Sequence, residues 1–230
     1  IFISLTGLLL VLGALAGRRV PDRRAHVTLW FLVAAAATGV FIARDLVAFL
    51  ACWQTLLLGV AMLLARQGSA GREAAAHFAV TTLAGAAASL IAVVALGVAR
   101  GSFDIDTLAA RPIAPRAQIL PALLCLLPFA TALPLFPFHG WLGRAHAAAA
   151  APVAMVLAGV VGSAAIYGIL RICIPLFPQG MASLAPLLVA VSAVGVLYSA
   201  IVAARQDDVR RLIAFASLMQ LNLAALALFA

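Results

Sequence analysis

Long apolar runs dominate the sequence and leave few folds open to it. Runs of about twenty residues, rich in Ala, Val and Leu, alternate with short connections that carry arginine. The hydrocarbon core of a bilayer is about 30 Å thick, and a helix needs roughly 20 apolar residues to cross it. Hydrophobic residues make up 66% of the chain and charged residues 10%. We therefore expect a membrane protein.

Charges and prolines mark the ends of the apolar runs. Because no strand-length alternation of apolar and polar residues recurs, we expect an all-α, polytopic transmembrane helical bundle over residues 1–230 as a single domain, not a barrel. Eight spans are predicted, at approximately 1–16, 27–43, 46–65, 75–99, 117–138, 149–171, 184–204 and 210–230.

The fifth predicted span is expected to be broken. Pro128, Pro134 and Pro137 lie within it or at its end, and each removes a backbone donor and crowds the preceding turn. A broken helix at membrane depth is tolerated where it is buried in protein or lines a wet cavity. A simple kink at the end of the helix is the alternative.

Arginine placement predicts the orientation of the bundle. All 15 residues counted as Lys or Arg are arginine. By the positive-inside rule, the more arginine-rich set of loops is cytoplasmic. Loops after odd-numbered spans carry Arg18, Arg19, Arg23, Arg24, Arg66, Arg72, Arg144, Arg205, Arg210 and Arg211, whereas the other loops carry Arg44, Arg100, Arg111, Arg116 and Arg171.

The sequence offers no site for redox chemistry or a metal. His139 and His146 follow the predicted break, and both a proton relay and ordinary hydrogen bonding are open to them. No carboxylate or cysteine lies nearby to complete a metal shell, and no nucleotide loop, haem ligand set or iron–sulfur cysteine cluster is present. We expect no metal and no cofactor. Because the arginines sit in short loops, we also expect no nucleic-acid partner.

Other polar residues have structural interpretations. Asp45 precedes a span, where a carboxylate caps a helix or pairs with an arginine, and Asp208 lies near the N-terminus of the last span, where the helix dipole favours an anion. Arg211 is expected to face the cytoplasm. Gln54 and Gln220 lie inside apolar runs and must find hydrogen-bond partners, protein or water.

The order of three landmarks is specific: PLFPFHGWL, then YGILRICIPLFP, then RQDDVRRLIAFAS. The chain resembles the antiporter-like proton-translocating subunits of respiratory complex I, most closely the M type. Related subunits occur in multisubunit sodium/proton antiporters and membrane-bound hydrogenases. The resemblance implies part of an inverted-repeat fold with a broken helix in each repeat. The eight spans then match the first repeat with flanking helices, as in a fragment of a longer subunit.

The resemblance also implies charged residues that this chain lacks. It implies a glutamate where Gln54 stands, lysines where Ala132 and Ser163 stand, and a histidine where Gln220 stands. Thr131, beside Ala132, is then able only to hold water. The candidate proton path therefore comprises Gln54, Thr131, Ala132, His139, His146, Ser163 and Gln220, and the structural or interface set comprises Asp45, Pro134, Pro137, Trp141, Asp208 and Arg211.

The resemblance implies a membrane subunit of a complex-I-like NADH:quinone oxidoreductase in a bacterial inner membrane, with other membrane subunits as partners. Its family role would be proton translocation, altered or absent here because the charged positions are vacant. The alternative is a structural subunit of a hydrogenase-like or antiporter-like complex that carries no protons. A transporter of another solute is weaker, because no charged binding group is visible within the spans.

Overall fold

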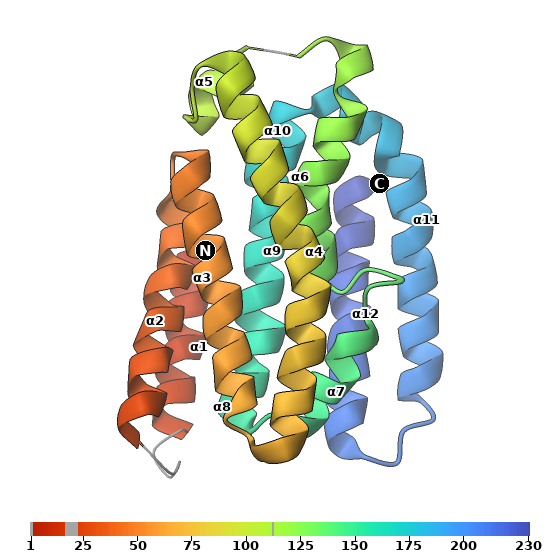
Figure 1. Ribbon diagram of the computed structural model, residues 1–230. Helices are drawn as coiled ribbons and strands as arrows, with labels where there is room; N and C mark the ends of the chain where they lie inside the picture. Colours follow the sequence, from red (N-terminus) through yellow and green to blue (C-terminus); the bar gives the residue numbers. More distant parts are fainter. Residues whose placement is uncertain (1, 17–22, 112) are drawn as a thin grey trace.

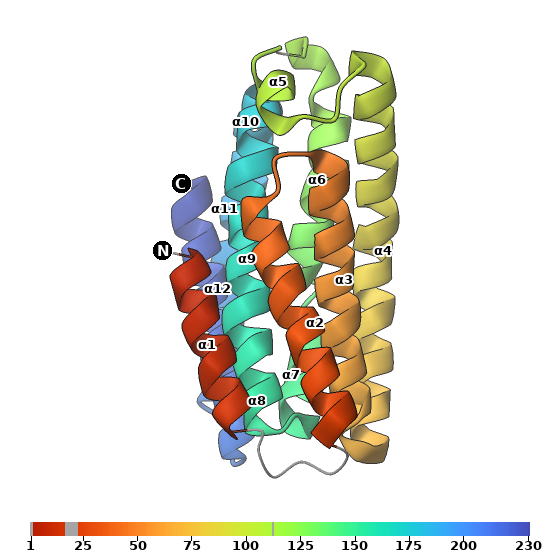
Figure 2. The same cartoon turned by 90° about the vertical axis from the view of Figure 1, so that its left-hand side faces the viewer.

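The computed structural model describes residues 2–16, 23–111 and 113–230, and over these residues it contains helices and no strand. Figures 1 and 2 show the long helices lying side by side in one bundle. The α-helices are α1 (Phe2–Ala16), α2 (Arg23–Ile42), α3 (Leu46–Ala65), α4 (Gly68–Arg100), α5 (Ile105–Ala109), α6 (Ile119–Ala132), α7 (Gly140–Ala148), α8 (Ala151–Met155), α9 (Gly162–Gly168), α10 (Ile174–Leu176), α11 (Pro178–Ala203) and α12 (Val209–Phe229).

The predicted helical bundle is confirmed, and every predicted span overlaps a helix. Six helical segments are long and apolar enough to cross a membrane, one of them the continuous stretch Ala151–Leu176. This stretch joins α8, α9 and α10 through the π-helical segments η3 (Val156–Val161) and η4 (Ile169–Cys173). The remaining two spans correspond to α1, with 15 residues, and α6, with 14.

Several predicted boundaries were wrong by more than a turn, among them the end of the sixth span, which continues to Leu176, and the starts of α4 and α11. Helix α4 begins at Gly68, not at 75, because a helix end near water accommodates Arg72 and Glu73. Helix α11 begins at Pro178, not at 184, since proline is favoured in the first turn, where its missing N–H costs no hydrogen bond.

The predicted break in the fifth span is confirmed. Helix α6 ends at Ala132 and α7 begins at Gly140, and Figure 1 shows the loop between them extending toward α11. Pro128 lies inside α6, so the interruption belongs to Pro134 and the residues after it.

The loops sort to the two ends of the bundle as the arginine pattern predicted. The connections α3–α4, α7–α8 and α11–α12 lie at one end, and α2–α3 and α4–α6 at the other (Figure 1). We call the first the arginine-rich end; its described members include Arg66, Arg72, Arg144, Arg205 and Arg211. Arg18 and Arg19 lie outside the described residues.

Helix α5 closes the opposite end, which we call the α5 end. The backbones of Asp45 and Asp104 form an isolated antiparallel bridge, in which Leu46 N–H donates to the Phe103 carbonyl at 2.9 Å. Asp106 of α5 pairs with Arg171 of η4 at 2.8 Å. Hydrogen bonds from Thr107 hold the pKa of the Asp104 carboxyl below its ordinary value. Short helix α5 is thereby fixed to two long spans.

Close helix packing in the core depends on small residues. A Cβ on Gly85 of α4 would lie 2.6 Å from the Pro128 Cα of α6, so only glycine lets the two backbones approach this closely. A Cβ on Gly168 of α9 would lie 2.2 Å from the Phe129 ring. Helix α6, which carries the break, is therefore held tightly between α4 and α9.

Candidate functional site

Backbone groups freed by Pro134 find new partners at the break. Pro134 has no N–H, so the Ala130 carbonyl loses its helical donor, and the Leu135 N–H donates to it instead at 3.0 Å. The Thr131 carbonyl accepts the indole N–H of Trp141 at 3.0 Å. Because Trp141 belongs to α7 and is 2% exposed, this bond joins the two halves of the broken helix in a buried place.

Trp141 therefore has a structural role, as the sequence suggested. Its ring also meets Phe78 of α4 edge-on, with centroids 4.8 Å apart. Pro134 is buried, whereas Pro137 is exposed in the loop. Thr131 itself, 1% exposed, donates its hydroxyl to the Pro128 carbonyl at 3.0 Å, so its side chain is satisfied within its own helix.

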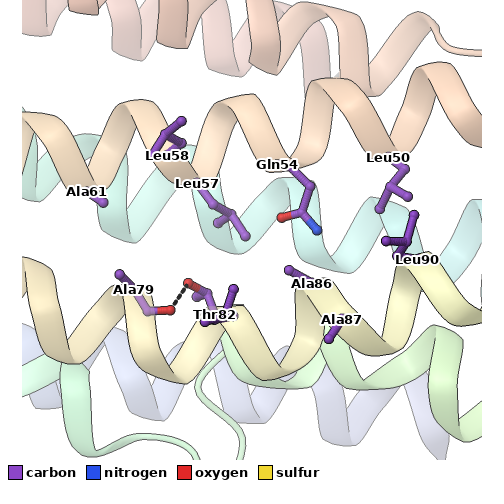
Figure 3. Close-up of a pocket in the computed structure, with 11 residues that line it drawn as sticks. Leu50, Gln54, Leu57, Leu58, Ala61, Ala79, Thr82, Ala86, Ala87 and Leu90 are labelled. Atoms are coloured by element: carbon purple, nitrogen blue, oxygen red, sulfur yellow. Dashed lines mark hydrogen bonds between the residues drawn. The ribbon is translucent and has the colours of Figure 1, made fainter.

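Gln54 lies in a groove between α3 and α4. Figure 3 shows its amide pointing from α3 toward α4. The amide N–H donates to the Ser89 hydroxyl of α4 at 3.4 Å, a long hydrogen bond, and Ser89 donates in turn to the Ala86 carbonyl at 2.8 Å. The groove has a volume of about 570 Å³ and is lined mainly by Leu and Ala. Gln54 thus sits half-buried in an apolar setting without an ionisable neighbour along the groove.

Aromatic side chains pack between α3 and α6 next to Gln54. The ring of Trp53 meets that of Phe129 edge-on, with centroids 5.2 Å apart. A cavity of about 20 Å³ lies among Trp53, Ser89 and Pro128. That is room for about one water molecule. The buried indole N–H of Trp53 has no partner among the described residues.

Ser163 and Ala132 occupy the two positions where the resemblance implies lysine. Ser163, half-buried, is the second residue of α9, just after the π-helical segment η3, and its hydroxyl donates to the Val160 carbonyl at 3.1 Å. Ala132 is 1% exposed at the last residue of α6. One turn after Ser163, the Tyr167 hydroxyl donates to the Phe41 carbonyl of α2 at 3.0 Å. Of these side chains, that of Ser163 is hydrogen-bonded within its own helix, whereas that of Tyr167 reaches α2.

His139 and His146 lie in different surroundings, and no contact between them is found among the described residues. The His139 ring lies against Tyr198 of α11, with centroids 4.6 Å apart, and stacks on Phe136. His146 is 3% exposed, and its Nε2 has no described partner. The two imidazoles also line separate cavities, so the described structure does not join them into one relay.

No group of three or more His, Cys, Asp or Glu residues that could hold a metal ion is found within residues 2–16, 23–111 and 113–230. Cys125 and Cys173 are buried and free, and Cys52 is partly buried and free.

Asp45 and Asp208 both cap helices; for Asp45 this is one of the two roles that the sequence left open. The Asp45 carboxylate accepts the Val47 N–H at 2.8 Å and the Ala48 N–H at 3.1 Å at the start of α3. The Asp208 carboxylate accepts the Arg210 N–H at 2.9 Å at the start of α12. Each carboxylate satisfies backbone donors that a helix terminus otherwise leaves free.

The last helix places its amides differently from what the sequence suggested. Gln220 is exposed on the outside of the described bundle, away from the other candidates. Asn222 is instead fully buried against α11, and its amide N–H donates to the Leu218 carbonyl at 2.9 Å. A Cβ on Gly195 would lie 2.1 Å from the Asn222 Oδ1. Ser192, Gly195 and Ser199 share one face of α11, and that small-residue spacing was the signal available in the sequence.

Gln118 is a structural residue that sequence reasoning missed. Its side-chain carbonyl accepts the N–H groups of Gln179 and Gly180, each at 2.9 Å, and its amide donates to the Ile113 carbonyl at 2.7 Å. It thereby caps α11 from a loop about sixty residues earlier. No local sequence pattern predicts a partner that lies about sixty residues away along the chain.

Comparison with known proteins adds to this geometry. Residues 43–230 match the family described as NADH:quinone oxidoreductase/Mrp antiporter, transmembrane. The chain is 34% identical over 226 residues to NAD(P)H-quinone oxidoreductase chain 4 2 of Thermosynechococcus vestitus, covering 96% of this chain and 42% of the relative. It is 30% identical over 244 residues to NADH-quinone oxidoreductase subunit M of Escherichia coli, covering 100% of this chain and 48% of the relative.

A solved structure agrees with the sequence comparison. A chain of respiratory complex I from Thermus thermophilus with bound NADH superposes with a TM-score of 0.86 at 30% identity, covering 99% of this chain and 50% of that one. The chain thus spans about half the length of these relatives.

Proposed function

Because the chain belongs to the NADH:quinone oxidoreductase/Mrp antiporter transmembrane family, we propose that it contributes one helical repeat to a membrane subunit of a complex-I-like NADH:quinone oxidoreductase. In this proposal, the family role is proton translocation coupled to electron transfer, and the repeat described here no longer carries protons through charged side chains. Its partners are other membrane subunits of the same assembly, within the lipid bilayer.

The observation that carries the proposal is the chemistry at Gln54, Ala132 and Ser163. Neither Leu46–Ala65 nor Ile119–Ala132 contains an acidic or basic residue. The Gln54 amide bonds to Ser89, Ala132 ends in a methyl group, and Ser163 bonds to its own helix. A proton crossing about 30 Å of hydrocarbon needs titratable side chains or a file of water, since a bare charge at that depth is expensive. These three positions supply no charge.

The repeat retains the hydrogen bonds and close packing that hold the broken helix. The Trp141 bond to Thr131 and the packing of Gly85 on Pro128 hold the broken helix in place without an ion pair. A repeat of this kind supports neighbouring helices and maintains the geometry of the broken helix, while protons cross the membrane through other parts of the assembly. The electron-transfer chemistry belongs to other subunits.

Proton translocation in the full-length protein within its native assembly tests this directly. We expect the double variant Gln54→Leu with Ser163→Ala to leave the number of protons moved per electron unchanged in membrane vesicles, because neither side chain carries a proton. A fall in that ratio would show that water held by these groups conducts protons, and the proposal would then be wrong.

Restoring charge gives the converse test. Gln54→Glu, Ala132→Lys and Ser163→Lys together reintroduce the ionisable groups that the resemblance implies. We expect proton uptake to change relative to the parent protein, provided that the variant assembles at the same level. A matched triple variant, Gln54→Met, Ala132→Met and Ser163→Met, has similar bulk without charge and should not reproduce the change. Equal proton uptake in the parent and the charged variant would contradict the proposed deficit.

The second candidate is a structural subunit of a membrane-bound hydrogenase or cation antiporter assembly. The vacant charges favour it, and the family itself includes Mrp antiporters. Isolating the native complex and identifying its subunits separates the two assemblies. Recovery of the protein as a lone monomer would contradict both.

We also propose a bacterial inner-membrane location with the arginine-rich end on the cytoplasmic side. The loop arginines support this orientation by the positive-inside rule. Reaction of an engineered cysteine at position 205 with a membrane-impermeant reagent tests it. We expect labelling in inverted vesicles and protection in intact cells.

A further inference from the structure

A polar pocket at the arginine-rich end differs from the other cavities. It lies between α7, α11 and α12, has a volume of about 330 Å³, and is lined by His139, Arg144, Tyr198, Gln206, Arg211 and Phe215 among others. We call it the α7–α11–α12 pocket. The groove beside Gln54 is lined mainly by Leu and Ala, whereas this pocket gathers side chains that donate hydrogen bonds.

The pocket carries positive charge without a carboxylate in its lining. Arg144 comes from α7, where its guanidinium contacts His77 of α4, and Arg211 comes from the first turn of α12. The guanidinium group of Arg211 has no hydrogen bond or ion pair with another described residue. The carboxylate of Asp208, three residues before Arg211, caps the Arg210 N–H. The two guanidinium groups therefore leave net positive charge for a ligand to neutralise.

Neutral groups around the two arginines suit an oxyanion. The phenol of Tyr198 and the amide of Gln206 both line the pocket, and the Gln206 amide already donates to the Val202 carbonyl at 3.2 Å. Guanidinium groups bind phosphate through paired N–H donors with fixed geometry. Tyr198, which lines the pocket, is 37% exposed.

The depth of the pocket matches a lipid headgroup. Tyr198 precedes Ala203, the last residue of α11, by five residues, which is about 7.5 Å along the helix axis. Tyrosine is enriched at this level, where the hydrocarbon core meets the polar interface. Arg211 lies in the first turn of α12, at the same end of the bundle.

An exposed apolar surface runs along α11 from the pocket toward the bundle centre. The exposed fractions are 60% for Ile201, 65% for Leu197 and 47% for Val194. A free inorganic anion would leave this surface uncovered, whereas a phospholipid would cover it with acyl chains while its phosphate entered the pocket. The combination of basic pocket and adjacent apolar surface favours a lipid as the occupant.

We propose that the α7–α11–α12 pocket binds the phosphodiester headgroup of an anionic phospholipid, held by Arg144 and Arg211, with its acyl chains along α11. Bound in this way, the lipid joins the second half of the broken helix to the α11–α12 pair. This assignment is independent of whether the repeat conducts protons.

The full-length protein in its native assembly, placed in lipid nanodiscs, provides the test. The probes are spin-labelled phosphatidylglycerol and phosphatidylcholine, and the quantity measured is the ratio of their association constants. We expect Arg144→Gln with Arg211→Gln to lower the preference for phosphatidylglycerol at least threefold. The matched control is Arg72→Gln with Arg205→Gln, which removes the same charge from exposed positions at the same end and should retain the preference.

Two further arms make the outcome decisive. Arg144→Lys with Arg211→Lys keeps the charge and should keep most of the preference, which separates headgroup binding from misfolding. Inorganic phosphate at millimolar concentration should not displace the labelled lipid. Equal losses in the pocket and control variants, or complete displacement by inorganic phosphate, would overturn the proposal.

Discussion

At the α5 end, charged side chains hold the loops and α5 against the long helices. At the break after α6, neutral hydrogen bonds to backbone carbonyls, one of them from an indole, hold the chain instead. Asp106 pairs with Arg171 and Asp45 caps α3 near water, where an ionised group keeps part of its hydration. In the buried break, Trp141 and Leu135 donate to carbonyls that Pro134 left free. The difference teaches that charge in this chain stays at the ends, and that the interior is held by neutral hydrogen bonds and close packing.

Introducing charge into the break should have the largest effect. Ala132→Lys places an ammonium group at a site that is 1% exposed and has no described acidic partner, and we expect a loss of about 2.5–3.5 kcal/mol of stability or more. The measurement is thermal unfolding in nanodiscs together with the yield of inserted protein. Ala132→Met adds comparable bulk without charge and should lose clearly less. Equal stability of the lysine variant and the parent would mean that the break is wetter than its packing indicates.

The break also shows how far the sequence alone reached. Prolines and apolar run lengths predicted the bundle and the interrupted fifth span, because both follow from backbone donors and bilayer thickness. The caps at Asp45 and Asp208 were also predictable, since N-capping is a local interaction. The partner of Trp141 across the break, the Gln118 cap on α11 and the burial of Asn222 rather than Gln220 were not, since each depends on how distant helices come together.

Overpacking the α11–α12 contact should have the next largest effect. In Gly195→Ala the new methyl group would lie 2.1 Å from the buried Asn222 Oδ1, and we expect a loss of about 2–3 kcal/mol. Gly7→Ala, where a Cβ meets nothing within 4 Å, is the helical control and should be neutral or slightly stabilising. Unfolding monitored by circular dichroism measures both. If the contact is as close as described, Asn222→Ala should offset part of the loss, and strictly additive effects would contradict it.

Removing the indole donor tests the neutral hydrogen bond that closes the break. Trp141→Phe leaves the buried Thr131 carbonyl without its partner, and we expect a loss of about 1–2 kcal/mol. Amide hydrogen exchange should rise over residues 130–146. Trp30→Phe removes a similar indole bond, to the Leu10 carbonyl at 2.9 Å, and should raise exchange near α1 instead. Unchanged exchange at the break in Trp141→Phe would show that the indole does not hold it.

The ion pair at the α5 end should matter least. Asp106→Asn removes the ion pair with Arg171. The Asp106 side chain is 54% exposed and that of Arg171 is 32% exposed. We therefore expect a loss of roughly 0.2–1 kcal/mol of stability that shrinks as salt is added. Unfolding measured at low and high ionic strength tests this, and Arg111→Gln, which removes an exposed charge nearby, serves as the control. A loss as large as that of Trp141→Phe would reverse the comparison, because the charged end and not the neutral break would then be the stronger attachment. A small, salt-sensitive loss would sharpen the comparison, because water solvates the separated charges at the α5 end, whereas the Thr131 carbonyl belongs to a residue that is only 1% exposed.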